Sequence, residues 1–150
     1  MHKKILVISD GVNQEEATIN AKSVCDDLID GQNAFDWYVP ISKSERFKTS
    51  ITQTTKINNP EIIKEIHDSL NSGLETFEFW VNESKKEKNQ SSKIMDLRIA
   101  TSPTTFFVFD GTDYCDGSYI TDIEEFEKVL KYQREKPQNQ IWVSAFDMHY

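Results

Sequence analysis

The two cysteines are the residues of this sequence best suited to chemistry, because a cysteine thiolate is a strong nucleophile. Cys25 and Cys115 lie far apart in the chain and form no Cys-x-x-Cys pair for redox or metal chemistry. Cys25 falls on the apolar side of a predicted helix, which favours a buried position. Cys115 lies between Asp113 and Asp116, and neighbouring carboxylates disfavour its thiolate. No disulfide framework is indicated, so we expect a reducing intracellular compartment.

The other reactive residue types give no catalytic pattern. His2, His67 and His149 lack the spacing of a metal site such as His-Glu-x-x-His. The serines occur in no Gly-x-Ser-x-Gly turn, and the glycines form no phosphate-binding loop. No two carboxylates can be paired for acid–base work from the sequence. We therefore predict no metal, no cofactor and no enzymatic activity.

Composition limits the classes of function. The chain has 150 residues, 37% of them hydrophobic, which suits one domain with a core of its own. Its formal net charge of -8 argues against direct binding of nucleic acid, which depends on lysine and arginine. No apolar run is long enough for a signal peptide or a membrane span. We expect a cytoplasmic protein; its oligomeric state stays open.

The first forty residues predict a strand, a helix and a second strand. Residues 4–9 form an apolar run that ends at a turn, which is typical of a buried strand. Asn13 and Glu16 have the spacing of a capping box, and the helix should end near Gly31. Residues 35–41 predict the second strand. A helical crossover of this length usually leaves the two strands parallel.

The remaining elements are predicted by their start and stop signals. Residues 42–58 are polar and predict a loop, after which Asn59-Pro60 begins a helix. Residues 71–73 should end that helix, with a second helical piece after them. Residues 104–109 and 113–119 predict a hairpin across Asp-Gly. A helix follows from the cap at 121, and 141–146 could add a short strand.

This order of elements resembles the thioredoxin/glutaredoxin superfamily. The segment Ser102-Pro103-Thr104-Thr105-Phe106-Phe107-Val108-Phe109-Asp110-Gly111 carries the likeness, and Asn20-Ala21-Lys22 is similar to small phage-encoded glutaredoxins. The resemblance implies a thioredoxin-like α/β domain with its core at about 3–132 and a C-terminal extension at about 133–150. It also implies a cis bond at Ser102-Pro103, although an ordinary trans proline at the start of a strand remains the alternative.

The active-site motif of that family is missing. The resemblance places its Cys-x-x-Cys on residues 15–18, where this chain has Glu15-Glu16-Ala17-Thr18. Disulfide exchange needs an activated sulfur, and a carboxylate or hydroxyl cannot replace it. The two glutamates have a simpler interpretation, because acidic side chains in the first turn complement the helix dipole. We therefore expect a redox-inactive member.

The favoured hypothesis is a protein that binds another protein, of unknown identity. The phage likeness adds the expectation that it modulates or inhibits a host factor. The aromatic residues of the tail could contribute to the binding face, or they could pack on their own domain. The candidate partner-binding residues are Glu15, Glu16, Thr18, Ser102, Pro103, Thr104, Trp142 and Phe146.

Two other hypotheses stay open. Cys115 and the following Asp116-Gly117-Ser118 fall where glutaredoxins hold part of glutathione, so the chain could be a glutathione- or single-cysteine-dependent thiol oxidoreductase. An acidic decoy that mimics DNA is the other, and it requires carboxylates arrayed on one face at the spacing of phosphates.

Overall fold

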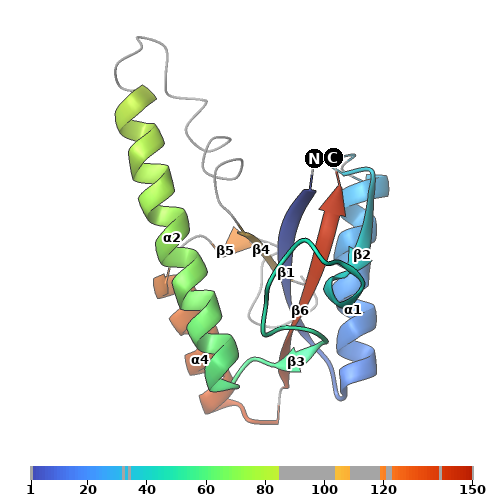
Figure 1. Cartoon of the computed structure of the whole chain (residues 1–150). Helices are drawn as coiled ribbons and strands as arrows, with labels where there is room; N and C mark the ends of the chain where they lie inside the picture. The colour runs from blue at the N-terminus through green and yellow to red at the C-terminus, as the bar shows by residue number, and fades with distance from the viewer. Residues whose placement is uncertain are drawn as a thin grey trace.

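The computed structural model describes residues 2–31, 33, 35–84, 104–108, 119–120, 123–138 and 140–149. For residues 73–81, 83, 84, 104–108 and 119 it describes the backbone alone. The elements follow in chain order (Figure 1): β1 (His2–Asp10), α1 (Gln14–Asp26), a π-helical turn (Asp27–Gly31), β2 (Trp37–Pro40), a 3₁₀ turn (Ile41–Lys43), β3 (Thr55–Lys56), α2 (Pro60–Ser84), β4 (Thr104–Val108), β5 (Tyr119–Ile120), α4 (Ile123–Glu135) and β6 (Ile141–His149).

The strands form one mixed sheet, which confirms the α/β class. Their order is β2-β6-β1-β4-β5, and β3 pairs with β6 as well. β1 runs parallel to β4 and antiparallel to β6, with which it pairs from His2↔His149 to Asp10↔Ile141. The first and last strands are therefore neighbours over their whole length, and both ends of the chain lie side by side (Figure 1).

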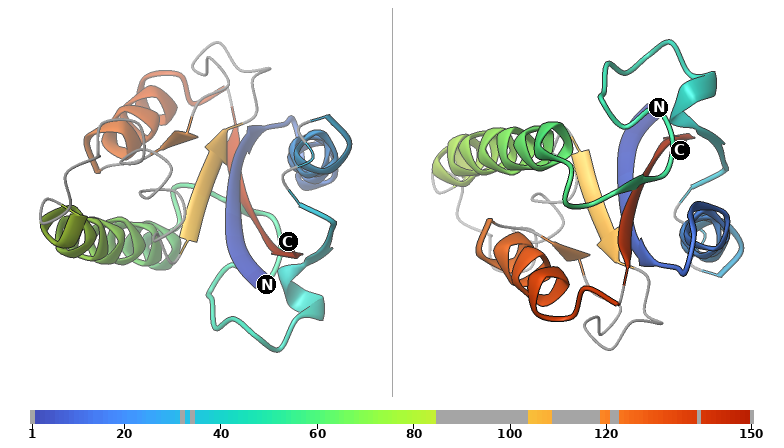
Figure 2. Two further views of the ribbon diagram at one scale, coloured as in Figure 1. Left: turned by 90° about the horizontal axis from the view of Figure 1, so that it is seen from above. Right: turned by 90° about the horizontal axis from the view of Figure 1, so that it is seen from below.

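Helices cover both faces of this sheet. Figure 2 shows α1 on one side and α2 with α4 on the other. The side chains of β1 alternate between the two: Ile5 and Val7 pack with α1, whereas Leu6 and Ile8 pack with α2 and α4. All four are at most 1% exposed. This explains why the sequence of β1 is continuously apolar, as expected for a strand covered on both faces.

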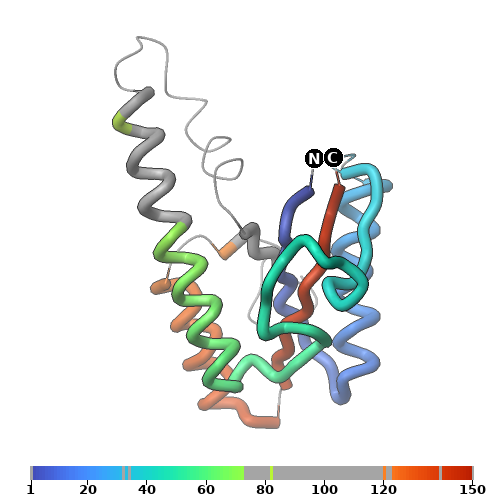
Figure 3. Tube along the Cα trace, in the orientation of Figure 1, coloured from blue at the N-terminus to red at the C-terminus, as the bar shows by residue number. Residues whose placement is uncertain are grey.

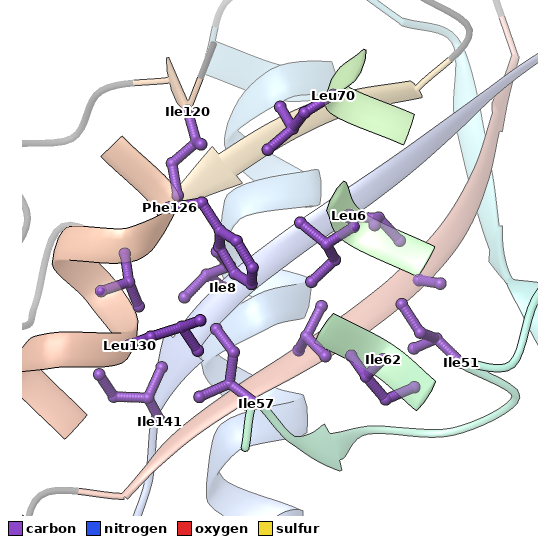
Figure 4. Close-up of a cluster of buried hydrophobic side chains, with 14 of the residues drawn as sticks. Leu6, Ile8, Ile51, Ile57, Ile62, Leu70, Ile120, Phe126, Leu130 and Ile141 are labelled. Carbon is purple, nitrogen blue, oxygen red and sulfur yellow. The ribbon is translucent and has the colours of Figure 1, made fainter. Parts of the chain in front are cut away.

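The larger of the two cores lies under α2 and α4 (Figure 4). The segment between β2 and α2 contributes to it as it runs along the sheet (Figure 3). Ile51 and Ile57 of that segment are fully buried, and Thr54 is 7% exposed. The polar composition of 42–58 correctly predicted little regular structure, but three anchors fix the segment to the domain.

The C-terminal segment is the main correction to the sequence-based fold. We predicted an extension at 133–150 with a possible short strand, but β6 is nine residues long and central in the sheet. It lies between β1 and β2, so these two strands point the same way but are not neighbours. The thioredoxin-like arrangement is not confirmed by this order. Apolar residues appear at consecutive positions of β6 because both of its faces are covered.

The helix predictions hold with one exception. Pro60 begins α2, and Asn59 Oδ1 accepts the Glu61 N–H at 3.0 Å. α4 buries three of the four residues of its predicted stripe, with Phe126, Val129 and Leu130 at 6% exposed or less, and Ile123 is partly buried. The predicted break at 71–73 is wrong, because α2 continues to Ser84. A glycine inside a helix costs only about 1 kcal/mol and does not end it by itself.

The predicted hairpin is described in part. β4 pairs antiparallel with β5, with Phe106 opposite Ile120 and Phe107 opposite Tyr119. The rest of the return strand at 113–118 lies outside the described residues.

Candidate functional site

The start of α1 is where the resemblance placed the active-site motif. Asn13 is the N-cap, and its Oδ1 accepts the Glu16 N–H at 2.9 Å. The Glu16 carboxylate in turn accepts the Val12 N–H at 2.6 Å. Glu16 therefore has the capping role that its spacing predicted. Glu15 is exposed beside it in the first turn, where a carboxylate stabilises the helix by interacting with the positive end of its dipole.

Thr18 belongs to a chain of hydroxyl groups inside the domain. Its Oγ1 lies 2.7 Å from the Gln14 carbonyl and 2.7 Å from Thr54 Oγ1. Thr54 Oγ1 lies 2.8 Å from Ser144 Oγ on β6, and that contact is buried. Gln14 Nε2 also donates to the Thr54 carbonyl at 2.7 Å. Thr18 therefore ties α1 to the 42–58 segment and the sheet, a role that its position in the sequence did not reveal.

The outer face of α1 is acidic and carries two exposed apolar side chains. Val12 is 76% exposed and Ile19 is 60% exposed. Among the described residues, Trp37 is the one other large apolar side chain that is exposed, at 41%. Helical spacing places Ile19 on the side opposite the buried Ala21 and Cys25, whereas Val12 lies just before the N-cap of α1. We define the outer α1 face by its exposed residues Val12, Glu15, Glu16, Ile19, Lys22, Asp26, Asp27 and Asp30.

The charges of the outer α1 face are not arranged for helix stability alone. Glu15 and Glu16 interact favourably with the positive amino end of the helix dipole. Asp26, Asp27 and Asp30 lie at the opposite end, where the carbonyl groups make the potential negative and carboxylates are repelled. The last turn of α1 carries no basic residue. This surface therefore holds a concentrated negative charge.

Thr104 does not join this face. Thr104 begins β4 and pairs with Lys4, near the amino end of β1, whereas α1 starts beyond its carboxyl end. Parallel pairing thus separates Thr104 from Glu15 and Glu16, and the predicted common face is wrong at this position. Ser102, Pro103 and Cys115 lie outside the described residues.

The two aromatic residues predicted to bind a partner are buried. Trp142 is 8% exposed, and its indole N–H donates to the Gly11 carbonyl at 2.9 Å. Phe146 is 2% exposed and packs edge-on against Tyr38. Both side chains therefore pack on their own domain, which is the alternative that the sequence left open for the tail. Gly11 also allows α1 to lie close to the turn after β1, because a Cβ there would meet the Ala17 backbone nitrogen at 2.5 Å.

Cys25 has no environment for a nucleophile. It is fully buried in the core under α1. Burial raises the pKa of its thiol, and the Asp26 carboxylate raises it further. A thiol in such surroundings is inert. This agrees with the structural role expected for Cys25.

A group of aromatic rings at the sheet end was missed by sequence reasoning. His2 and His149 pair across β1 and β6, and Trp37 of β2 stacks on His149 with ring centroids 5.1 Å apart. His2 Nδ1 lies 2.8 Å from Asp147 Oδ1. The other carboxylate oxygen of Asp147, Oδ2, accepts a hydrogen bond from the Ser44 hydroxyl at 2.6 Å. No sequence spacing links His2 to His149, because only the sheet register brings the chain ends together.

A polar cavity of about 640 Å³ opens beside α2. On its wall, the Lys4 ammonium lies 3.2 Å from Glu65, which also accepts the Thr49 hydroxyl at 2.5 Å and the Ser50 N–H at 2.6 Å. Burial opposes ionisation of Glu65, but these three donors outweigh it and hold the pKa of the carboxyl below its usual value. This group joins β1, the 42–58 segment and α2, so its role is structural.

Comparisons with known proteins give no relative. No family model, no curated protein and no solved structure matches this chain. Among the described helices, none is long and apolar enough to cross a membrane. The described residues contain no group of three or more His, Cys, Asp or Glu side chains that could hold a metal ion.

Proposed function

We propose that this protein acts by binding another protein through the outer α1 face, without redox turnover. The observation that carries the proposal is the exposure of two apolar side chains beside acidic residues: Val12, just before α1, is 76% exposed, and Ile19 of α1 is 60% exposed. Exposed apolar side chains rimmed by polar residues mark interaction sites. Neither side chain belongs to the buried face of α1, which is formed by Ala17, Ala21 and Cys25.

The chemistry of this face favours a particular class of partner. Five carboxylates against the single Lys22 favour a segment rich in lysine and arginine. Val12 and Ile19 favour apolar side chains between those cations. An amphipathic basic helix has both features and is a recurring ligand in protein recognition. The thioredoxin-like resemblance stays a prediction, and the proposal does not depend on it.

The test is a titration of the ¹⁵N-labelled protein with a designed amphipathic peptide of lysine and leucine. We expect saturable shift changes at the amides of residues 12–30 and little change elsewhere. A peptide with glutamate in place of lysine should not bind. Shift changes spread evenly over all acidic surfaces would contradict a defined site.

Two variants separate apolar from electrostatic recognition. Ile19→Ser should weaken binding by about five-fold even at high salt, because an exposed apolar contact is worth roughly 1 kcal/mol. Glu15→Gln should weaken binding mainly at low salt, where exposed charges are least screened. Glu61→Gln, on the exposed start of α2, is the matched control and should bind as the wild type does. Equal affinities of Ile19→Ser and the wild type for the peptide would exclude the outer α1 face as the binding site.

A further inference from the structure

The first part of the segment between β2 and α2 is fixed by apolar contacts at its two ends (Figure 3). Ile41 is 4% exposed and Ile51 is fully buried, and both belong to the larger core. No residue from 42 to 50 is fully buried, and the one apolar side chain among them, Phe47, is only partly buried against that core. We define residues 44–50 as the strap. Apolar burial alone therefore contributes little to holding the strap in place.

Two carboxylates hold the strap instead. Asp147 of β6 accepts the Ser44 hydroxyl through Oδ2 at 2.6 Å. Glu65 of α2 accepts the Thr49 hydroxyl through Oε1 and the Ser50 N–H through Oε2 at 2.6 Å. In each case the strap supplies the donors and the sheet or the helix supplies the acceptor.

Glu65 is suited to this role only in its ionised form. Its Oε1 faces the Thr49 hydroxyl and, at 3.2 Å, the Lys4 ammonium, and its Oε2 faces the Ser50 N–H. An ionised carboxylate offers acceptors at both oxygens, whereas a protonated one carries an O–H donor at one of them. Protonation also removes the charge that attracts Lys4. The contacts to the strap therefore weaken when Glu65 binds a proton.

The charged groups around Glu65 favour the ionised form on balance. Those that line the same cavity come from three elements: Lys4 of β1, Lys48 of the strap, and Glu61, Lys64 and Asp68 of α2. Lys64 lies 2.6 Å from Asp68, so these two charges compensate each other. Burial opposes ionisation of Glu65, but the bonds from Thr49, Ser50 and Lys4 outweigh it and hold the pKa below the ordinary value of 4.5.

We propose that the strap is an acid-sensitive element of the fold. Ionised Glu65 holds it closed, and protonation of Glu65 releases residues 45–50 while the rest of the domain stays folded. The residues that follow stay in place, because Ile51 is buried and Thr54 is hydrogen-bonded to Ser144. The stabilisation of the closed form is complete above the ordinary pKa and is lost as the pH falls through the lower folded value.

Release of the strap changes the cavity beside α2. Phe47, Lys48 and Ser50 form part of the wall of this 640 Å³ cavity, so their departure opens it to solvent. The strap is bonded to α2, on the side of the sheet opposite α1 (Figure 2). The inference is therefore independent of binding at the outer α1 face.

The Ser50 amide reports directly on this contact, because its N–H is bonded to Glu65 Oε2. In the ¹⁵N-labelled full chain, its shift should titrate with a midpoint below pH 4.5. Its protection against hydrogen exchange should fall by about ten-fold over the same range, relative to the amides of β1 and β6. The proposal is overturned if the Ser50 shift does not titrate, or if Ser50 loses protection only together with β1 and β6, as in global unfolding.

The Glu65→Gln variant tests the strap at neutral pH. A glutamine amide has one acceptor oxygen, so its NH₂ group must face a donor of the strap or Lys4. Trypsin cleaves after lysine and arginine, and the exposed Arg46 and Lys48 lie within the strap. Cleavage at these two residues should be about ten-fold faster than in the wild type. Glu61→Gln makes the same change one turn earlier on α2 and should be cut at the wild-type rate.

A second variant covers the case in which Glu65→Gln does not fold. Thr49→Val removes one donor of the strap, leaves the carboxylate in place and should speed cleavage by about three-fold. Circular dichroism establishes which variants are folded. Wild-type cleavage rates at Arg46 and Lys48 in every folded variant of this pair would overturn the proposal.

Discussion

The two sides of the sheet differ in how they are packed and in what they present to solvent. Under α1 the core is small, built from residues such as Ala21 and Cys25, and it is joined to the chain of hydroxyls at Thr18, Thr54 and Ser144. Under α2 and α4 the core is larger and rich in isoleucine. The α1 side presents an acidic surface, whereas the cavity beside α2 on the other side is lined by three lysines and three acidic residues. The negative net charge of the chain therefore describes the outer α1 face but not the lining of that cavity.

The largest expected effect tests whether the two cores contribute differently to stability. Phe126 is fully buried in the larger core, and Phe126→Ala should lower the free energy of unfolding by about 3–5 kcal/mol. Cys25→Ala, in the smaller core, removes one sulfur atom and should cost about 1 kcal/mol. Urea unfolding of both variants measures the difference. Similar losses would show that the α1 core is as tightly packed as the other.

The sheet end offers a second comparison, between two carboxylates that each contact a histidine. The Asp147 side chain is 3% exposed and contacts both His2 and Ser44. The Asp36 side chain is 69% exposed and contacts His149. Asp147→Ala should therefore lower stability by about 1–3 kcal/mol, and Asp36→Ala by less than about 0.5 kcal/mol. Thermal unfolding of the two variants under the same conditions measures both values, and an equal loss would contradict the burial argument.

Glu65 should make the free energy of unfolding depend on pH in the acidic range. Its folded pKa lies below the usual value of 4.5, so its ionised form stabilises the fold above that pH. This contribution is lost as the pH falls from about 4.5 through the lower folded value. The Glu65→Gln variant should thus lose less stability between neutral and acidic pH than the wild type. Glu61→Gln is the exposed control, and denaturant unfolding across this pH range should show the wild-type slope for it.

A small effect is expected from the hydroxyl chain that ties α1 to the sheet. Thr18→Val keeps the shape of the side chain and removes its hydroxyl, which should cost about 1 kcal/mol. Thr18→Ser restores the hydroxyl and should recover part of that loss. Hydrogen exchange of the α1 amides is the measurement, since a loosened helix exchanges faster than the rest of the domain. Unchanged exchange in Thr18→Val would show that the apolar contacts of α1 hold it without this chain.

Local signals in the sequence predicted the elements well but not their arrangement. The cap at Asn13, the start of α2 at Pro60 and the buried stripe of α4 follow from contacts between residues a few positions apart. The position of β6 could not be predicted in this way. A continuous apolar segment near the end of a chain fits an edge strand, a docking tail or a central strand equally well.

The candidate site shows the same limit. Glu15 and Glu16 were found by their spacing, and the structure places them where the helix start predicts. Their association with Thr104 failed because it depended on strand direction, and β4 runs parallel to β1. The exposure of Val12 and Ile19 was also missed, since the face that a helix buries depends on what packs against it.

The sequence by itself determined the α/β class, the helix caps, the buried nature of Cys25 and the absence of a thiol pair at the start of α1. These depend on residue type and short spacing, where the physics is local. Only the tertiary structure decided that β6 joins β1 and that His2 meets His149. These contacts join distant segments, and the free energy that selects them comes from burying both faces of one sheet together, which no short stretch of sequence contains.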